Sequence, residues 1–482
     1  MKVLFLPTYF ATPHLETEFE LMADYLDEGH EVYALQCQGE LPTCFGNPEH
    51  RRSLCLECRG RFEKGMEVLG NRVTVLPMSR SSDCSEGIPS QFSDIDALKG
   101  FTWQGAQIGL SAASTLITKN NEHRLDTIVH QESVDREVRT AIHVFKNFKD
   151  TAERIEADHG VIFNGRFSTS LPAINACEQL GISYSTHERG GMSNHYWLVQ
   201  GALPHDIDNA TREIATKWAS LPEGEAIRRG SVFFTDRRAR VEHSWYSYTK
   251  RQRRQQLPAG FDPNQHNISF FNSSIEEYEA VRCWPAPINI YKDEIDAITR
   301  IVESAADDPS IRFYVRIHPN LSGRDNTQTR RLRGLHGKYA NLTVIDAESP
   351  VDTYELMERS AAIVTFGSTM GAEACYWCKP SILLGRALYE NEDCAYRPLD
   401  HQETVRLIRQ KDLPPRPQIG ALRYGLWDLE RGTPFRHFKP ESLTGGTFDG
   451  QRVRPRRSLR PWIFVLKIVE YASMRLNLRW WK

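Results

Sequence analysis

Short apolar runs alternate with amphipathic segments in both halves of this chain, and this alternation restricts the fold more than any other feature. Residues 2–8 form a continuous apolar run, apolar side chains then recur at helical spacing from Leu15 to Leu26, and residues 31–35 form a second run. A strand, a helix and a second strand in this order predict a βαβ unit with buried parallel strands. Ligands of such sheets bind at the carboxyl ends of the strands.

The second half of the chain repeats the same alternation. Apolar runs over residues 268–271, 313–317, 341–345, 361–366 and 379–384 are separated by helical patterns, including those near 290–306 and 351–359. A length of 482 residues suits two domains of roughly 200 residues each. We therefore predict an α/β protein of GT-B-like architecture, with two doubly wound Rossmann-like domains facing across a cleft.

The predicted domain boundaries follow breaks in the sequence pattern. An arginine-rich stretch over 228–256 is interpreted as a solvated helix that joins two domains, and Pro258 to Pro263 interrupts the chain after it. We expect an N-terminal domain over 1–257 with a cysteine-rich insert at 37–58. A C-terminal domain over 258–450 and a basic aromatic segment over 451–482 complete the prediction.

Two strand ends in the second half carry groups that can bind an anion. One reads Arg316-Ile-His318-Pro319, and the other reads Gly367-Ser368-Thr369 with Glu373 one helical turn further on. A strand, a turn and a helix N-terminus place free backbone N–H groups where they can donate hydrogen bonds to a phosphate. A nearby carboxylate can reach sugar hydroxyls. Simple caps produce the same patterns, but their combination predicts a nucleotide-sugar site.

Three predicted strands of the first half also end in polar clusters. His14 follows the first strand, Asn164-Gly-Arg166 follows another, and His187-Glu188-Arg189-Gly-Gly follows a third. Loops at strand ends concentrate function in this architecture. We consider Glu188 and His14 competing candidates for a general base, with Glu16 as an orienting group for His14. The alternatives are an ion pair of Glu188 with Arg189 or Arg166, and a surface histidine at position 14.

Four of the ten cysteines lie close together in the sequence, at Cys37, Cys44, Cys55 and Cys58. The two-residue spacing of the last pair and the scarcity of apolar residues around them suit a structural Cys₄ zinc site, which would supply folding energy. Four reduced thiols are the alternative, and such a site would have no open position for catalysis.

Composition restricts the partners and the compartment. Hydrophobic residues make up 40% of the chain, charged residues 25%, and the formal net charge is −2, so no general attraction to nucleic acid is expected. No apolar run approaches the roughly 20 residues that cross a bilayer. A charged helix follows the first apolar run directly, without the small-residue cleavage site of a signal peptide. We therefore expect a cytoplasmic protein.

The C-terminal segment carries a separate signal. Between Arg452 and Lys482 there are nine lysine or arginine residues and one acid, Glu470, interleaved with Trp462, Phe464, Tyr471, Trp480 and Trp481. A basic helix with tryptophan at its ends suits the headgroup region of an anionic membrane and a lipid-linked acceptor, which places the protein on the inner face of the cytoplasmic membrane. A terminal helix docked on the first domain is the alternative.

Several of the strand-end blocks described above resemble bacterial capsule and surface-polysaccharide biosynthesis proteins, the group that contains the Kdo transferases of capsule assembly. The resemblance covers about half of the chain, in the blocks Asn164 to Gly190, Phe271 to Ser274, Arg316 to Pro319 and Gly367 to Glu373. The His-Pro and Ser-Thr elements also resemble bacterial sialyltransferases and glycerol-phosphate polymerases, in which the histidine and the hydroxyl pair hold the donor phosphate. The resemblance gives that role to His318, Ser368 and Thr369.

The resulting functional hypothesis is a glycosyltransferase that moves a sugar from a nucleotide-sugar donor to a glycan or lipid-linked acceptor. The expected donor-binding residues are Ser273, Ser274, Arg316, His318, Ser368, Thr369 and Glu373, and the expected acceptor-binding residues are Arg166 and Arg189. No Asp-x-Asp motif occupies a suitable strand end, so we expect catalysis without a metal cofactor. A UDP-sugar 2-epimerase and a catalytically inactive binding or scaffold protein of polysaccharide assembly are the alternatives.

Overall fold

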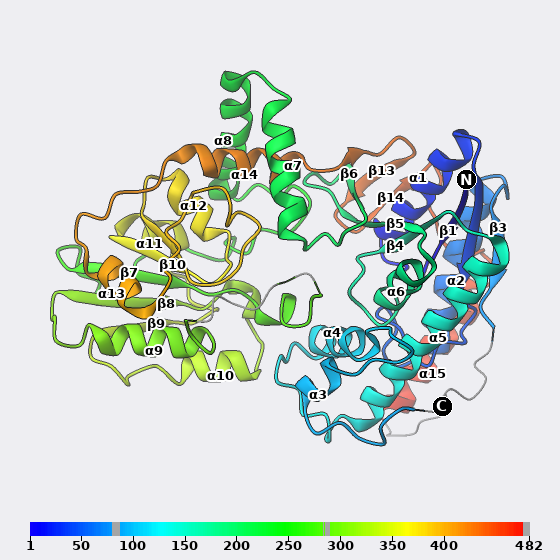
Figure 1. Ribbon diagram of the computed structural model, residues 1–482, viewed down its shortest axis with the longest axis horizontal. Helices are drawn as coiled ribbons and strands as arrows, with labels where there is room; N and C mark the ends of the chain where they lie inside the picture. Colours follow the sequence, from blue (N-terminus) through cyan, green and yellow to red (C-terminus); the bar gives the residue numbers. More distant parts are fainter. Residues whose placement is uncertain (80–86, 283, 285–289, 476–482) are drawn as a thin grey trace. The chain divides into compact units, whose positions relative to one another are not determined.

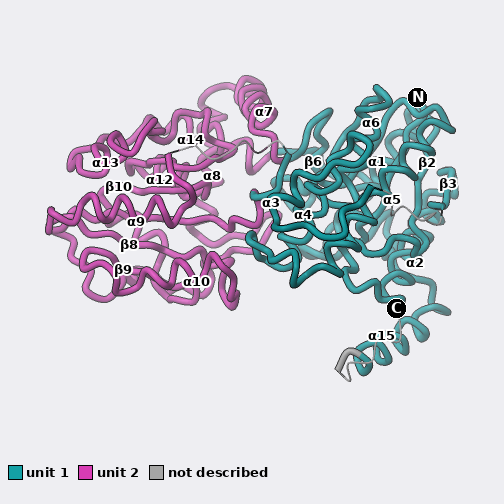
Figure 2. The backbone as a smooth tube through the Cα atoms, turned by 60° about the horizontal axis from the view of Figure 1, so that its bottom comes forward, with its two compact units in different colours: residues 1–204, 279–282, 431–482 teal, residues 205–278, 283–430 magenta. Residues whose placement is uncertain are grey.

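The chain folds into two compact units, which Figure 2 distinguishes by colour. The computed structural model describes residues 1–79, 87–282, 284 and 290–475. Unit 1 comprises Met1–Pro204, Glu279–Arg282 and Arg431–Lys482, and unit 2 comprises His205–Tyr278 and Cys283–Glu430. Each unit is built around its own sheet (Figure 1).

The sheet of unit 1 has its strands in the order β12-β6-β5-β4-β1-β2-β3. These are β1 (Lys2–Phe5), β2 (Glu31–Gln36), β3 (Thr74–Pro77), β4 (His159–Phe163), β5 (Ser183–Arg189), β6 (His195–Gln200) and β12 (Thr433–Pro434). The five strands from β3 to β5 are parallel, and β6 and β12 extend one edge in antiparallel pairing.

Helices cover this sheet because its strands are apolar on both faces. The helices of unit 1 are α1 (His14–Asp27), α2 (Arg52–Val68), α3 (Ile95–Lys99), α4 (Ile108–Asn120), α5 (Gln131–Ile155), α6 (Leu171–Leu180) and α15 (Arg460–Arg475). Phe5 on β1 packs with Phe19 on α1 and Phe62 on α2 in one core. The close packing of α1 on α2 requires Gly65, since a Cβ there would lie 2.1 Å from the Phe19 ring.

The sheet of unit 2 is entirely parallel, in the order β11-β10-β7-β8-β9. Its strands are β7 (His266–Phe271), β8 (Ile311–Arg316), β9 (Leu342–Ile345), β10 (Ala362–Thr365) and β11 (Ser381–Leu383). The helices are α7 (Ile207–Ala219), α8 (Glu223–Ala239), α9 (Glu294–Ser304), α10 (Thr327–Arg333), α11 (Thr353–Arg359), α12 (Met370–Tyr376), α13 (His401–Arg409) and α14 (Gln418–Glu430). One apolar core joins the sheet to α9, and a second joins the opposite face to α11 and α12.

Both parallel sheets have the same strand order, which confirms the prediction of two doubly wound Rossmann-like units. Numbered within each unit, the parallel strands follow the order 3-2-1-4-5. The order reverses between the first and the fourth strand, which are β1 and β4 in unit 1 and β7 and β10 in unit 2. The loops after such a pair diverge and leave room for a ligand.

The division of the chain differs from the predicted boundary at residue 257. Residues 205–257 belong to unit 2, because α7 and α8 pack on α14. A Cβ on Gly230 of α8 would lie 2.5 Å from the Leu422 carbonyl of α14, so these two helices are in very close contact. The arginine-rich stretch is therefore only partly a solvated connection, since Arg229 pairs with Glu430 and Arg238 pairs with Glu358 within unit 2.

The predicted C-terminal domain also ends earlier than residue 450. From Arg431 the chain belongs to unit 1, where β12 pairs with β6 and a hairpin follows, formed by β13 (Phe438–Ser442) and β14 (Gly445–Phe448). The buried Glu20 carboxylate accepts the backbone N–H groups of Arg436, His437 and Phe438, which secures this return. A two-residue strand leaves no recognisable sequence pattern, which explains why the prediction placed the boundary later.

The C-terminal helix α15 docks on α2 of the same unit. The buried Glu470 carboxylate accepts hydrogen bonds from the Ser53 backbone N–H, at 3.0 Å, and from the Ser53 hydroxyl. Docking is thus observed for the described part of the predicted basic aromatic segment, whereas Trp480 and Trp481 lie outside the described residues. Within the described part of the chain, no helix is long and apolar enough to cross a bilayer.

Candidate functional site

The strand-end residues predicted in the second half converge at the carboxyl edge of the unit 2 sheet. The strands β10, β7 and β8 end level with one another, because Phe271 pairs with both Thr365 and Arg316. The loops that follow carry Ser273, Ser274, His318, Ser368 and Thr369, which we call the hydroxyl–imidazole cluster. The first residues of the loops after β7 and β10 lie close together at the reversal point, since a Cβ on Gly367 would lie 3.6 Å from the Ser273 Oγ.

His318 is held in one orientation and in one tautomer. Its backbone N–H donates to the Asn272 side-chain oxygen at 2.8 Å, and its Nδ1 accepts the Asn320 backbone N–H at 3.1 Å. The ring proton therefore lies on Nε2. Burial lowers the pKa of His318 to about 4, with a further contribution from Arg237 and Arg316, so the imidazole is neutral near pH 7. It offers an N–H donor to an anion.

The hydroxyl groups of the cluster differ in how they are engaged. The buried Ser273 Oγ has no hydrogen-bond partner among the described residues, whereas Ser274 Oγ accepts from the Asn320 side-chain amide at 3.3 Å. Ser368 Oγ accepts the Met370 N–H at the start of α12. A buried hydroxyl without a partner is costly unless a ligand or water satisfies it, so Ser273 is the best placed of these groups to meet a phosphate oxygen.

Glu373, predicted to reach sugar hydroxyls, instead contacts groups of the protein itself. Its side chain is fully buried and accepts hydrogen bonds from Arg237 at 3.1 Å and from the Tyr354 hydroxyl at 2.6 Å. Thr369 also donates to it, at 3.1 Å, and receives a hydrogen bond from Arg237. Burial alone would lower the pKa of Arg237, but Glu373 together with Tyr354, Asp428 and Tyr424 raises it overall. Glu373 therefore positions a guanidinium beside the cluster.

Arg316 is buried, and two of its guanidinium nitrogens bind the neighbouring loop. Its side chain is 1% exposed and donates to the backbone carbonyls of Asp346 and Ser349 in the loop after β9. Burial lowers its pKa to about 10, so the guanidinium remains charged near pH 7. The positive charge acts at a distance on His318, while its hydrogen bonds hold the neighbouring loop.

Beside His318 lies a cavity of about 440 Å³, which the sequence analysis did not anticipate. Tyr246 and Tyr248, Pro319, and the segment from Ala347 to Ser349 contribute to its lining. The Tyr248 ring lies edge-on to the His318 imidazole, with 5.5 Å between the ring centroids. The only sequence feature that could have indicated this cavity is the aromatic group Trp245-Tyr-x-Tyr248 within the arginine-rich stretch. This group shows neither helical nor strand periodicity.

In unit 1, the two competing candidates for a general base meet at the reversal point of the sheet. His14 begins α1 after the loop that follows β1, and Glu188 lies near the end of β5. The His14 Nδ1 lies 3.5 Å from a Glu188 carboxylate oxygen. The other Glu188 oxygen accepts from the Asn164 side-chain amide at 2.8 Å, and the first also accepts the Arg189 backbone N–H. We call these two residues the His14–Glu188 pair.

The surroundings of this pair set its protonation. His14 is 6% exposed and packs against Phe163, with ring centroids 4.5 Å apart, and against Tyr9. Burial lowers the pKa of His14 to about 4, although the Glu188 charge opposes this shift. Burial would raise the pKa of Glu188, but the His14 ring and the hydrogen bonds of Asn164 and Arg189 lower it overall. Near pH 7 the pair is a neutral imidazole beside a carboxylate.

Three further predicted residues near the pair have structural roles. Arg189 donates to the backbone carbonyls of Thr12 and Leu443, at 3.0 and 2.8 Å, which holds the loop before His14. Arg166 is 8% exposed and lies over the Phe167 ring, with its guanidinium carbon 4.7 Å from the ring centroid. Glu16 does not orient His14, because it pairs with Arg61 and accepts from the Thr12 hydroxyl.

The four clustered cysteines are free thiols in one region of unit 1, at the end of β2, in the following loop and on the first two turns of α2. Asn47 links two of them, because its N–H donates to the Cys44 carbonyl and its amide lies 3.3 Å from the Cys55 sulfur. Burial raises the pKa of Cys58, and Cys44, Cys37 and Cys55 add to this shift. Among the described residues, only Glu20, Asp24 and His437 bring three possible metal-ligand atoms within 4.8 Å of one another. The four cysteines lie in one region, but no three of their sulfur atoms are that close together.

Several solved structures are similar to this chain at low sequence identity. No protein-family model and no curated protein sequence matches the chain. KpsC from Thermosulfurimonas dismutans, a β-Kdo 2,4 transferase, is 15% identical over 56% of this chain and 79% of its own, with a TM-score of 0.37. The β-Kdo 2,7 transferase KpsC of the same organism is 12% identical over 67% of this chain and 89% of its own (TM-score 0.36).

Sugar-nucleotide epimerases also occur among the similar structures. UDP-GlcNAc 2-epimerase from Neisseria meningitidis is 12% identical over 98% of this chain and 100% of its own, with a TM-score of 0.28. At these identities and TM-scores the similarity assigns no activity to this chain.

Proposed function

We propose that this protein is a nucleotide-sugar-dependent glycosyltransferase of surface-polysaccharide biosynthesis, with the donor held by unit 2. The observation that carries the proposal is the convergence of Ser273, His318 and the Gly367-Ser368 turn at the reversal point of a Rossmann-like sheet. An open-sheet α/β unit binds its ligand at this position. The resemblance of the sequence blocks to capsule transferases supports the polysaccharide substrate class.

The chemistry of the cluster suits the phosphate of a nucleotide. His318 offers its Nε2–H and Ser273 offers an unsatisfied hydroxyl, so both can donate to phosphate oxygens. Arg237 and Arg316 add positive charge without occupying the ligand position. The adjacent cavity with Tyr246 and Tyr248 suits a nucleobase, because a tyrosine ring provides a stacking surface. A donor phosphate and its nucleoside would thus occupy neighbouring positions along the same edge.

The His14–Glu188 pair suits the activation of an acceptor hydroxyl. In the proposed reaction, His14 accepts the hydroxyl proton at Nε2, and the acceptor oxygen forms a bond to the anomeric carbon. The bond from that carbon to the donor phosphate breaks, and the phosphate leaves with the electron pair, stabilised by His318. The Glu188 carboxylate, 3.5 Å from the His14 Nδ1, favours a proton on Nδ1 and stabilises the imidazolium by its charge, as carboxylates do beside other histidine bases. No metal ion is needed for these steps.

An epimerase remains the second enzyme hypothesis, and a donor-only incubation separates the two. An epimerase converts the sugar nucleotide without an acceptor, whereas the proposed transferase leaves it intact except for slow hydrolysis. A binding or scaffold protein would retain nucleotide binding without either reaction.

We also infer that the cysteine cluster holds a structural zinc ion. Cys55 and Cys58 lie at i and i+3 on α2, and Cys37 and Cys44 approach from the preceding segment. Four cysteines provide the complete ligand set of a closed tetrahedral site. Zinc would displace the thiol protons, which the raised pKa values otherwise retain, and would draw the sulfur atoms together.

The first prediction concerns donor binding. Nucleotides that fit unit 2 are expected to raise the melting temperature, since a ligand that binds only the folded form stabilises it. In a screen of CMP, CDP, UDP and GDP, the responding base identifies the donor class. His318→Ala is expected to weaken that nucleotide about 10- to 100-fold, the effect of losing a hydrogen bond to a charged group. His336→Ala, at an exposed histidine of the same unit, should leave the affinity unchanged. Equal affinity of the two variants would remove His318 from the site.

The second prediction concerns the pH dependence of transfer. Because the pKa of His14 is lowered to about 4, kcat/KM should be constant between pH 6 and 8 and decline in acid toward that value. Glu188 raises the His14 pKa, so Glu188→Gln should move the acid limb to lower pH while the rate falls about 100-fold or more. His14→Ala should lose nearly all activity, and the remaining rate should not decline in acid. Full turnover by His14→Ala, or an unmoved limb in Glu188→Gln, contradicts the assignment.

The third prediction concerns the metal. Elemental analysis of the purified chain should find about one zinc per molecule, the stoichiometry of a single four-cysteine site. Cys58→Ser should remove most of it and lower the melting temperature, because metal binding contributes folding free energy. Cys378→Ser, at an exposed thiol of unit 2, provides the matched control. A metal-free wild-type protein, or iron with labile sulfide, rules out the zinc site.

A further inference from the structure

The C-terminal helix α15 exposes an apolar face although it is docked on unit 1. Six of its side chains are large, apolar and exposed, namely Trp462, Phe464, Val465, Ile468, Val469 and Tyr471. They account for six of the sixteen such side chains found among the described residues. The inward face instead carries Ile463, Glu470 and Ser473. A helix that turns its apolar residues outward requires an apolar partner, because water does not favour such a surface.

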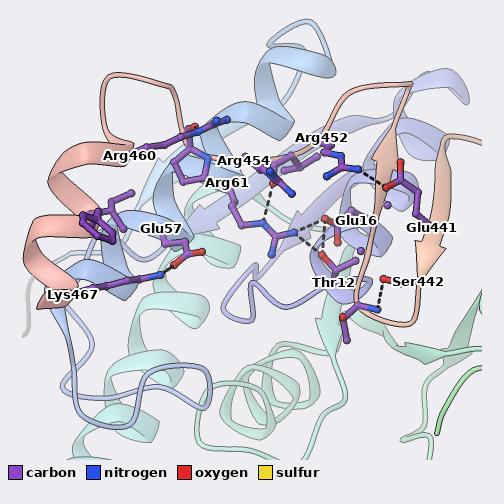
Figure 3. A pocket seen from close by; sticks show the side chains of 17 residues that line it. Thr12, Glu16, Glu57, Arg61, Glu441, Ser442, Arg452, Arg454, Arg460 and Lys467 are labelled. Carbon is purple, nitrogen blue, oxygen red and sulfur yellow. Dashed lines mark hydrogen bonds and ion pairs between the residues drawn. The ribbon is translucent and has the colours of Figure 1, made fainter. Parts of the chain in front are cut away.

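Next to this face lies a cavity of about 670 Å³, which we call the arginine cavity (Figure 3). Its walls come from the start of α1, from α2, from the β13–β14 hairpin and from the segment that leads into α15. Five cationic side chains contribute to the lining, Arg61, Arg452, Arg454, Arg460 and Lys467, together with three carboxylates, Glu16, Glu57 and Glu441. The cavity therefore carries a net positive charge.

Three of the five cationic side chains in the cavity form ion pairs with its carboxylates, and the other two can contact a ligand. Glu16 pairs with Arg61, Glu57 with Lys467 and Glu441 with Arg452. Arg460 donates to the Pro455 carbonyl, and neither Arg454 nor Arg460 pairs with a carboxylate among the described residues. Both of these arginines are exposed, so an anion can reach them from solvent. Arginine binds phosphate oxygens through paired N–H groups, which favours a phosphate over other anions.

The cavity reaches the loop that leads into His14. Thr12 lines the cavity and lies two residues before His14. Arg189, next to Glu188, donates to the carbonyls of Thr12 and of Leu443 in the hairpin that lines the cavity. Arg61 also donates to the Phe10 carbonyl and the Thr12 hydroxyl. A group bound in the cavity would therefore lie against the wall that positions the proposed base.

We propose that α15 and the arginine cavity together form a docking surface for an anionic membrane. The apolar face of α15 lies in the headgroup region of the bilayer, and a lipid headgroup phosphate binds between Arg454 and Arg460. Aromatic and aliphatic side chains beside arginines are the features of helices that lie in the membrane interface. This inference rests on the proposed transferase function for its meaning, since it names the surface at which a lipid-linked acceptor is presented. Membrane binding itself requires neither donor nor turnover.

The experiment is co-sedimentation of the full chain with vesicles. The probes are vesicles of phosphatidylcholine alone and of phosphatidylcholine with 30% phosphatidylglycerol. We expect the wild-type protein to bind the anionic vesicles at least tenfold more tightly than the neutral ones. The double variant Arg454→Gln/Arg460→Gln should lose about tenfold or more of that affinity, because each arginine near an anionic surface contributes to binding. Trp462→Ala/Phe464→Ala should reduce binding to both kinds of vesicle.

A charge-matched control keeps the test specific to the cavity. Arg154→Gln/Arg228→Gln removes two exposed arginines elsewhere and should bind anionic vesicles like the wild type. All replaced side chains are exposed, so equal melting temperatures of the variants confirm that each one is folded. Equal vesicle binding of wild type and Arg454→Gln/Arg460→Gln overturns the proposal. Stabilisation by soluble glycerol phosphate without vesicle binding also overturns it, in favour of a soluble phosphate ligand. The nucleotide screen is unaffected by either result.

Discussion

The reversal of strand order in each parallel sheet is the constraint on which both candidate sites depend. Adjacent loops at the carboxyl edge diverge only where neighbouring strands continue to opposite sides of the sheet. In unit 2 the loops after β7 and β10 leave the sheet at this reversal, and their first residues stay close, because a Cβ on Gly367 would lie 3.6 Å from the Ser273 Oγ. In unit 1 it lies between β1 and β4, so that His14 and Asn164 approach Glu188 from different parts of the chain.

Burial then determines how the two histidines behave. Both His14 and His318 have pKa values lowered to about 4, so each is neutral near pH 7. Their neighbours differ, however, and so do their chemical roles. His14 lies beside a carboxylate that stabilises a captured proton, which favours a base. His318 lies near Arg237 and Arg316, whose positive charges oppose protonation of its ring. The neutral ring can then donate a hydrogen bond to an anion, while the two arginines balance the charge of that anion.

The sequence predicted the positions where function concentrates better than it predicted the role of each side chain. His318 and Ser273 follow apolar strands, so their place at the sheet edge was foreseeable. The contact of Glu373 with Arg237 was not foreseeable, because Arg237 lies 136 residues earlier and no sequence pattern reveals the pairing. Tyr246 and Tyr248 were missed because they belong to an irregular segment. The return of the chain to unit 1 depends on the two residues of β12 and on the buried Glu20, which leave no periodic signal.

Binding of a nucleotide phosphate by the hydroxyl–imidazole cluster can be measured by hydrogen–deuterium exchange in the presence of the best-binding nucleotide. We predict slower backbone exchange in three separate segments, 272–275, 317–320 and 366–370, which meet only at the carboxyl edge of the unit 2 sheet. Unchanged exchange in all three segments at saturating nucleotide, or protection confined to other parts of the chain, would contradict this prediction.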